Sequence, residues 1–435
     1  MNSNFRKKLI NWICLLFIFA IPFGTKKFLF FLPFPFTNNA VGEYSSVFLY
    51  GTDIIGFVFV VLVFLFLRKV LSELCKQWWM TAVFVGLSLI SISQALNVPL
   101  ALYASLRLVF VILAALAVAA ALKSGYTSIE RILTALGASA VFQAIAAFLQ
   151  FLFQRSVGLK LLGESFITET SVGVARATVE GAELLRAYGT MAHANILAAF
   201  LVVGLVSFYC LYFRTNDLKK VYKLFIVLSI FMLWLGLVFT FSRSGWIVAG
   251  IATVATLCYG FLNKQLRNQT AILFLVLVFI LGLLFSTLNW AIFPRAHFTS
   301  HEFSVAHRWE YNKIGWELMQ KHPFGVGVGN QLVSGVEEGI YKSHGLTWFW
   351  SWQPIHNIYL LIGSEIGFLG LAAFLLLVGW LLIKRSFDFI SIMFIGLLVF
   401  GLFDHFTWDL QSGRLMFWVV LGILMGYKNQ HLKSN

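Results

Sequence analysis

Long apolar runs separated by short polar segments extend over the whole chain. Twelve ranges are mostly apolar and lack the strict alternation that is typical of a half-buried strand. A run near 20 residues is long enough to cross the hydrocarbon core of a bilayer as a helix. The pattern predicts spans, with boundaries good to a few residues, at 9–24, 47–67, 78–96, 100–122, 132–153, 194–213, 221–241, 245–262, 270–289, 356–383, 389–403 and 412–427.

The composition agrees with this pattern. Of the 435 residues, 60% are hydrophobic and only 11% are charged, whereas a soluble domain has roughly 25% charged residues. In lipid, only helices and closed barrels satisfy their backbone polar groups, and barrel strands would appear as short alternating segments. We therefore predict an all-α polytopic membrane protein with about twelve transmembrane helices, which form a single membrane domain over residues 1–435.

The basic residues indicate the orientation of the spans. The chain has a formal net charge of +14. If the N-terminus lies in the cytoplasm, the loops on that side hold this whole excess, and the rest of the chain is neutral. The positive-inside rule predicts such an asymmetry, so we place both termini in the cytoplasm and expect no nucleic acid partner. None of the four cysteines falls in a predicted outer loop, so no outer disulfide is expected.

Two long segments are predicted on the outer side, at 154–193 and 290–355. Long loops without regular structure are uncommon unless they are functional. In the second segment Ala306, Trp309, Lys313, Trp316 and Gln320 fall on one side at helical spacing. Pro323 follows, which predicts an amphipathic helix over Ser304–Lys321. This large loop before the tenth span is therefore expected to contribute to a functional site.

Four polar residues from distant parts of the sequence are predicted to lie at the outer face. Arg186 precedes the sixth span, and Arg243 follows the seventh in VFTFSRSGWIVAG. Arg308 lies on the predicted loop helix, and His356 opens the tenth span. Guanidinium groups bind two phosphate oxygens at once, and histidine accepts a proton near neutral pH. The set suits glycosyl transfer from a polyprenyl diphosphate to a hydroxyl acceptor.

Each of these residues has a simpler interpretation when it is taken alone. An arginine at the end of a span is often an anchor in the headgroup region. Arg186 and Arg308 would equally suit loop salt bridges, and Arg243 would suit the cap of a helix break. His356 would suit a hydrogen bond to the neighbouring loop. The functional interpretation therefore depends on the four residues lying together.

Other polar residues are candidates for contacts with the substrate or the acceptor. Arg107 lies inside the fourth span and needs a partner, either Asp53 or Glu365. It is then half of a structural pair or part of the wall of a lipid-phosphate pocket. His193 and Asn195 are expected to form a hydrogen-bonded helix start. Further possible contacts are Asn357, Glu365, Asp404, His405 and Asp409. The loop histidines do not have a metal-ligand spacing, so no metal or other cofactor is expected at His297, His301 and His307.

Four segments between residues 180 and 370 have a specific order and spacing. They are RAYGTMAHANILA, FTFSRSGWI, HRWEYNKIGWELMQKHPFGVGVGN and PIHNIYLLIGSEIGFLG. Together they resemble the O-antigen ligase and O-antigen polymerase superfamily of bacterial membrane glycosyltransferases. The resemblance implies a twelve-helix, GT-C-like fold in the bacterial inner membrane with an extracytoplasmic active site. It also implies inverting transfer of a glycan from undecaprenyl diphosphate, without a nucleotide sugar or a required metal.

The resemblance assigns roles but not an acceptor. It implies that Arg186, Arg243 and Arg308 bind the diphosphate and that His356 is the base. A ligase would use lipid A-core as its acceptor, whereas a polymerase would extend a growing glycan, and the sequence does not separate the two. A transporter of lipid-linked glycans would also use arginines, but transporters usually show related halves and helix breaks near the midplane. The clustering of polar residues at one face favours an enzyme.

Overall fold

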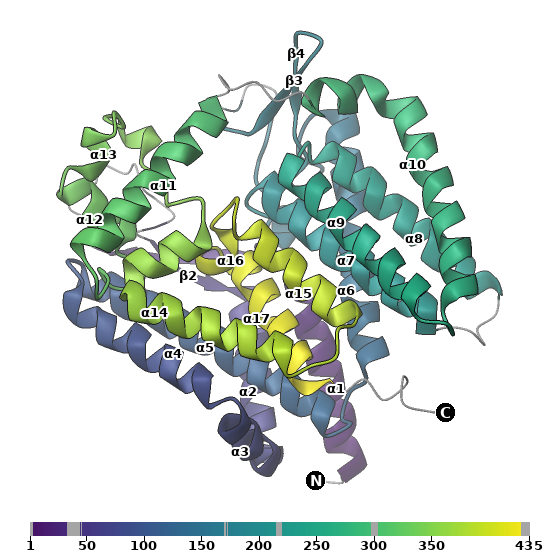
Figure 1. Ribbon diagram of the computed structural model, residues 1–435, viewed down its shortest axis with the longest axis horizontal. Helices are drawn as coiled ribbons and strands as arrows, with labels where there is room; N and C mark the ends of the chain where they lie inside the picture. The colour runs from purple at the N-terminus through teal and green to yellow at the C-terminus, as the bar shows by residue number, and fades with distance from the viewer. Residues whose placement is uncertain are drawn as a thin grey trace.

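The computed structural model describes residues 3–32, 44, 46–168, 171, 173–214, 220–296 and 303–427, and within these ranges the chain is mostly helical (Figure 1). The longer helices are α1 (Ser3–Ala20), α2 (Gly51–Phe66), α3 (Arg68–Gln77), α4 (Trp79–Ile90), α5 (Val98–Lys123), α6 (Ile129–Phe153), α7 (Ala194–Arg214), α8 (Lys220–Phe239), α9 (Arg243–Leu262), α10 (Arg267–Ala296), α11 (Phe303–Lys321), α14 (Ile358–Ile383), α15 (Phe389–Phe400) and α17 (Gln411–Gly426). The short helices are α12 (Gln331–Glu337), α13 (Ile340–Ser343) and α16 (Phe406–Asp409). Two antiparallel strand pairs accompany them: β1 (Lys26–Phe31) with β2 (Ser46–Tyr50), and β3 (Arg176–Val179) with β4 (Ala182–Leu185).

The predicted class, an all-α polytopic membrane protein, is confirmed, but the number of twelve spans is not. Within the described ranges, seven helices are long and apolar enough to cross a membrane, or eight if α2 and α3, bent by 100°, form one span. Every predicted apolar range overlaps a helix, although the range 47–67 begins in β2 and the range 389–403 extends beyond the end of α15. However, α15 has 12 residues and α17 has 16, and at about 1.5 Å per residue these are shorter than the hydrocarbon core.

Helix α7 lies at the centre of the bundle. Every residue from Ala194 to Phe213 is buried, and α6, α8, α9 and α15 pack around the helix. A helix that is enclosed by protein can present polar side chains at its ends without exposing them to lipid. The start of α7 is therefore a protected position for Asn195.

Helix α17 packs against α5 through glycines. A Cβ atom at Gly422 would lie 2.4 Å from the carbonyl oxygen of Ala115, and one at Gly426 would lie 2.5 Å from the Cα atom of Ala119. Small residues allow such close approach of two helix backbones. As a result, the two helices run together over most of the length of α17.

The segment predicted as the large outer loop contains more helix than expected. α10 continues to Ala296 across a break at Leu288, so its last turns replace the first residues of the expected loop. The amphipathic helix predicted at Ser304–Lys321 corresponds to α11, which ends before Pro323. The placement of 154–193 and 290–355 outside the membrane, and the GT-C-like likeness, stay predictions.

The chain after α11 folds back onto the middle of α14. At Gly367, φ is 80°, and a Cβ atom there would lie 2.4 Å from the carbonyl oxygen of Pro323. Only glycine permits this conformation and this contact at low cost. The backbone N–H groups of Val326 and Gly327 donate to carbonyl groups of α14 at 2.9 Å. Figure 1 shows α11, α12 and α13 together on one side of the bundle, beside the beginning of α14.

Candidate active site

A hydrogen-bond network begins at the N-terminal end of α7. The side-chain amide of Asn195 donates to Asp404 at 2.8 Å, and its oxygen accepts from Arg186 at 2.6 Å. Ser242, which precedes α9, donates to the same oxygen at 3.0 Å. Asn195 is only 4% exposed, so these bonds form in an environment where they are strong. Three distant segments of the chain therefore meet at one buried amide.

Arg186 is fixed in this network and keeps donors for a ligand. Its Nε atom donates to the carbonyl oxygen of Thr240 at 2.7 Å, and Nη2 donates to Asn195. These two bonds to described residues use two of its five N–H groups. Burial, followed by repulsion from Arg295, lowers the pKa of Arg186 to about 9. The guanidinium group therefore remains charged at neutral pH.

His356 lies just before α14, and its environment keeps it neutral. The centroid of its ring is 4.8 Å from that of His405 and 5.2 Å from that of Tyr311, on which it stacks. Its Nδ1 atom lies 2.9 Å from the carbonyl oxygen of Pro354, which only accepts, so Nδ1 carries the hydrogen and Nε2 keeps its lone pair. Burial, followed by the charge of His405, lowers the pKa of His356 to about 3. His356 is therefore a neutral side chain whose Nε2 atom accepts no hydrogen bond from a described residue.

His405 and two carboxylates complete the cluster around His356. The Nδ1 atom of His405 lies 2.8 Å from Asp409, and its Nε2 atom lies 3.9 Å from Asp404. Burial lowers the pKa of His405, but its attraction to Asp409 and Asp404 outweighs burial and raises the pKa. Burial raises the pKa of Asp404, but the two histidines and Arg308 outweigh it and lower the pKa. The two histidines are thus driven toward opposite protonation states.

Arg308, on α11, faces the same cluster and has no protein partner in the described part of the chain. Its charge contributes to lowering the pKa values of Arg186, His193 and His356, so it lies within electrostatic reach of all three. No hydrogen bond or ion pair of its guanidinium group involves a described residue, and the side chain is half-buried. An unpaired guanidinium in such a position is suited to binding an anion.

Arg243 joins the site through the backbone next to Ser242 and through a second arginine. Its Nε atom donates to the carbonyl oxygen of Arg295 at 2.7 Å, and Nε of Arg295 donates to the carbonyl oxygen of Phe241 at 3.3 Å. These bonds link the start of α9 to the end of α10. Because Arg295 repels Arg186 electrostatically, this pair lies beside the network rather than elsewhere on the bundle.

Arg107 and Glu365 line a cavity beside this network. Arg107 forms an ion pair with Asp53 at 2.5 Å, so the structure selects the first of its two predicted partners. Glu365 accepts a hydrogen bond from the indole of Trp408 at 2.7 Å. Both side chains are buried. These bonds do not test whether Arg107 or Glu365 contacts a substrate, so both contacts stay predictions.

Asn357 and His193 lie at helix starts. The side-chain oxygen of Asn357 accepts from the backbone of Tyr359 and Leu360 at 3.0 and 3.2 Å and caps α14. The backbone N–H of Asn195 donates to Nδ1 of His193 at 3.1 Å, which confirms the predicted hydrogen-bonded helix start. Burial, followed by the charge of Arg186, lowers the pKa of His193 to about 3.

His356, Asp404 and His405 also have a spacing that could hold a metal ion. One donor atom from each lies within 4.8 Å of the other two. However, Arg308 acts electrostatically on all three, and its positive charge opposes a bound cation. The arrangement fits proton transfer next to bound anions better than it fits a metal centre.

Sequence reasoning missed some features of this site. Arg295 follows Pro294 near the end of α10. Counting spans places it at the same face as Arg243. It is not among the predicted site residues because the sequence pattern assigns it to a loop. Asp404 and His405 were considered only as acceptor contacts, although they adjoin His356. Of the three loop histidines at which no metal is expected, His297 and His301 lie outside the described residues, and His307 is half-buried against Tyr311.

Comparison with known proteins gives a match to a family model. Residues 227–375 match the family model described as O-antigen ligase. The matched range contains Arg243, Arg308 and His356, and the segments with Arg186 and Asp404 lie outside it. No curated protein matches the chain. The family match confirms the resemblance drawn from the sequence segments.

Proposed function

We propose that this chain, which matches the O-antigen ligase family model over residues 227–375, transfers a glycan from undecaprenyl diphosphate to a hydroxyl acceptor at the outer face of the bacterial inner membrane. The observation that carries the proposal is the position of His356. It is a neutral histidine with a free Nε2 atom, and it lies within electrostatic reach of the unpaired cation Arg308. A proton acceptor beside Arg308 and the remaining N–H donors of Arg186 suits attack by a hydroxyl group on a diphosphate-linked sugar.

The arginines would bind the donor. In this proposal Arg308 and the free donors of Arg186 hold oxygens of the diphosphate, while Arg243 and Arg295 add positive charge beside them. The bond between the anomeric carbon and the phosphate oxygen is the one that breaks. Undecaprenyl diphosphate then leaves with the bonding electrons, and the guanidinium groups stabilise its additional negative charge. Such a leaving group needs no general acid.

His356 would act on the acceptor. Its Nε2 atom takes the proton of the acceptor hydroxyl as that oxygen bonds to the anomeric carbon, with inversion at that carbon. The bound diphosphate and Asp404 are negative charges that favour the imidazolium formed in this step. Asp409 holds His405 by its Nδ1 atom, which orients the ring against which His356 lies.

The same residues would serve a polymerase as well as a ligase, because the two differ only in the acceptor. Lipid A-core is the acceptor of a ligase, and a growing glycan is the acceptor of a polymerase. A lipid-linked glycan transporter would use the arginines but would have no use for a neutral histidine with a free acceptor nitrogen. The enzyme is therefore the proposal that accounts for more of the site.

Reconstituted transfer tests the proposal. The purified chain in detergent would be given a radiolabelled glycan on undecaprenyl diphosphate, together with lipid A-core or an unlabelled lipid-linked repeat unit. We expect label in a new glycosidic product and release of undecaprenyl diphosphate. If the chain in vesicles moves the lipid across the bilayer but forms no glycosidic bond under either condition, the transporter is correct and the enzyme proposal is wrong.

A further inference from the structure

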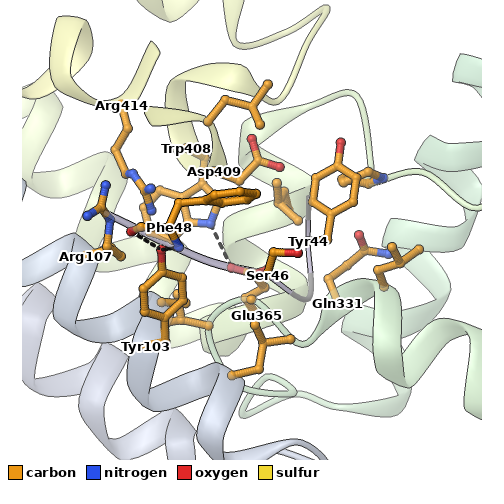
Figure 2. A pocket seen from close by; sticks show the side chains of 18 of the residues that line it. Tyr44, Ser46, Phe48, Tyr103, Arg107, Gln331, Glu365, Trp408, Asp409 and Arg414 are labelled. Carbon is orange, nitrogen blue, oxygen red and sulfur yellow. Dashed lines mark hydrogen bonds between the residues drawn. The ribbon is translucent and has the colours of Figure 1, made fainter. Parts of the chain in front are cut away.

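A cavity of about 100 Å³ lies next to the candidate active site, between α5, α14 and the start of α17 (Figure 2). A water molecule needs about 10–15 Å³ of such space, so the cavity has room for several small polar groups. Aromatic side chains form much of its wall: Tyr44, Phe48, Tyr50, Tyr103 and Trp408. Apolar and aromatic walls with a few convergent polar groups are typical of small-molecule sites.

One of the two arginines in this wall forms no ion pair with a described residue, although Asp409, which holds His405, attracts it electrostatically. Arg107 pairs with Asp53 and also donates to Gln411. Arg414, only 8% exposed, makes no side-chain hydrogen bond or ion pair with any described residue, and its buried Nε atom has no partner. In Figure 2 both guanidinium groups lie at the same end of the cavity, and their charges are close enough to interact. An unpaired buried cation is costly, so its presence indicates an anionic ligand.

The cavity adjoins the reacting groups through Asp409. This carboxylate lines the cavity and also accepts from Nδ1 of His405. The ring of His405 lies against that of His356, the proposed base. Pro354, whose carbonyl oxygen accepts from Nδ1 of His356, lines the cavity as well. A molecule in the cavity is therefore next to the group that would remove its proton.

We propose that this cavity is the acceptor subsite and that it takes a sugar carrying an anionic group, a carboxylate or a phosphate, bound by Arg414. The statement that the bound sugar is the acceptor rests on the proposed function. The guanidinium fork matches both anions in two-point hydrogen bonds, while the aromatic side chains contact the apolar faces of the ring. Arg107 is already neutralised by Asp53 and therefore shapes the cavity rather than selecting the charge.

Calorimetric titration of the full chain in detergent tests the subsite without any transfer reaction. The probes are glucuronic acid, glucose 6-phosphate and glucose, which share a ring and differ in charge. We expect at least one anionic probe to bind about 10-fold more tightly than glucose, in line with a charge-assisted hydrogen-bonded pair. The anionic probe that binds more tightly identifies carboxylate or phosphate as the preferred group. Equal binding of all three probes overturns the proposal.

Variants separate this subsite from the diphosphate site. Arg414→Gln is expected to reduce the binding of the anionic probe to the level of glucose, and Arg414→Lys to retain part of the preference. Arg308→Gln, in the diphosphate site, is the matched control and should leave the preference unchanged. If Arg414→Gln fails to fold, the wild-type titration and Arg414→Lys still decide, because an undiminished preference in Arg414→Lys together with a lost preference in Arg308→Gln contradicts the assignment. Preferential binding without any glycosyl transfer would refute the proposed function while leaving the anion subsite in place.

Discussion

The two ends of α7 both have arginines beside them, but only one end neutralises them. At the C-terminal end, Arg214 forms an ion pair with Glu130 at 2.5 Å and donates to the hydroxyl of Tyr427. At the N-terminal end, Asn195 gathers Arg186 into a network in which Arg308 has no partner among the described residues. A paired arginine holds helices together, whereas an unpaired one in a protected position is suited to an incoming anion. The difference separates a structural site from a functional one on a single helix.

The largest effect is expected from removing the proposed base at the N-terminal end. His356→Ala should lower the rate of glycan transfer by roughly 100-fold or more, because a general base commonly contributes that factor. Binding of the undecaprenyl diphosphate donor should change little, since the arginines remain. Single-turnover transfer and donor titration on the same preparation measure the two quantities separately.

His322 provides the control for this variant. It is a half-buried histidine that contacts Glu338 at 2.7 Å, away from the network. His322→Ala should keep the wild-type rate. Loss of donor binding in His356→Ala, or full activity in it, would show that the residue is not the base.

A smaller effect is expected when the arginines at the two ends of α7 are exchanged for lysine. Arg186→Lys loses the two-point geometry and the bonds to Thr240 and Asn195, so the donor should bind about 10-fold more weakly. Arg214→Lys should lower the unfolding temperature and leave donor affinity unchanged. Equal loss of donor affinity in both variants would remove the distinction between the two ends.

The histidines predict a pH dependence of stability that belongs to the N-terminal end. His193 and His356 have folded pKa values near 3, below the ordinary 6.5, so the unfolded chain binds more protons between these values and stability falls as the pH drops through this window. His405 has a raised pKa, so its contribution is present below pH 6.5 and is lost as the pH rises through the raised pKa. The unfolding temperature in detergent should therefore be highest near pH 6.5.

The histidine variant that checks this dependence is His193→Gln. It should reduce the loss of stability on the acid side and leave the alkaline side unchanged. A profile of unfolding temperature against pH that is the same in His193→Gln and in the wild type would contradict the assignment of the acid side to this histidine.

The smallest effect is expected at the start of α14. Asn357→Ala removes the cap on the backbone of Tyr359 and Leu360, which should cost about 1 kcal/mol of unfolding free energy. Asn357→Asp keeps an acceptor and should retain most of the stability. Denaturant unfolding of the two variants measures this difference, and a large loss of transfer in Asn357→Asp would instead indicate a direct contact with the substrate.

The sequence was sufficient to predict the helices but not to predict how many of them are long enough to cross the membrane. Uninterrupted apolar runs predict helices well, because the helix is what satisfies the backbone in lipid. The run at 389–403 looked like a span, yet α15 ends at Phe400 after 12 residues. Hydropathy measures how apolar a segment is, but where a helix stops depends on local contacts that the pattern does not contain.

For the site, counting spans predicted which distant residues lie near one another but not their hydrogen bonds. Arg186, Arg308 and His356 were expected together because each adjoins the same side of a span, and their mutual electrostatic effects in the structure agree with this. The role of Asn195 as the meeting point was not predictable, since its partners Ser242 and Asp404 are set by tertiary packing. Their separation along the sequence, 47 and 209 positions, leaves no local pattern to recognise.

The most direct test of the central claim is the affinity of the purified chain for undecaprenyl diphosphate and for undecaprenyl monophosphate. The account predicts that the wild type prefers the diphosphate by about 10-fold or more, as expected for additional charge-assisted hydrogen bonds. Arg308→Gln should abolish that preference, and Arg214→Gln should keep it. A preference that survives in Arg308→Gln, or is absent in the wild type, would contradict the claim that the arginines at the N-terminal end of α7 bind the diphosphate with Arg308 as a principal contact.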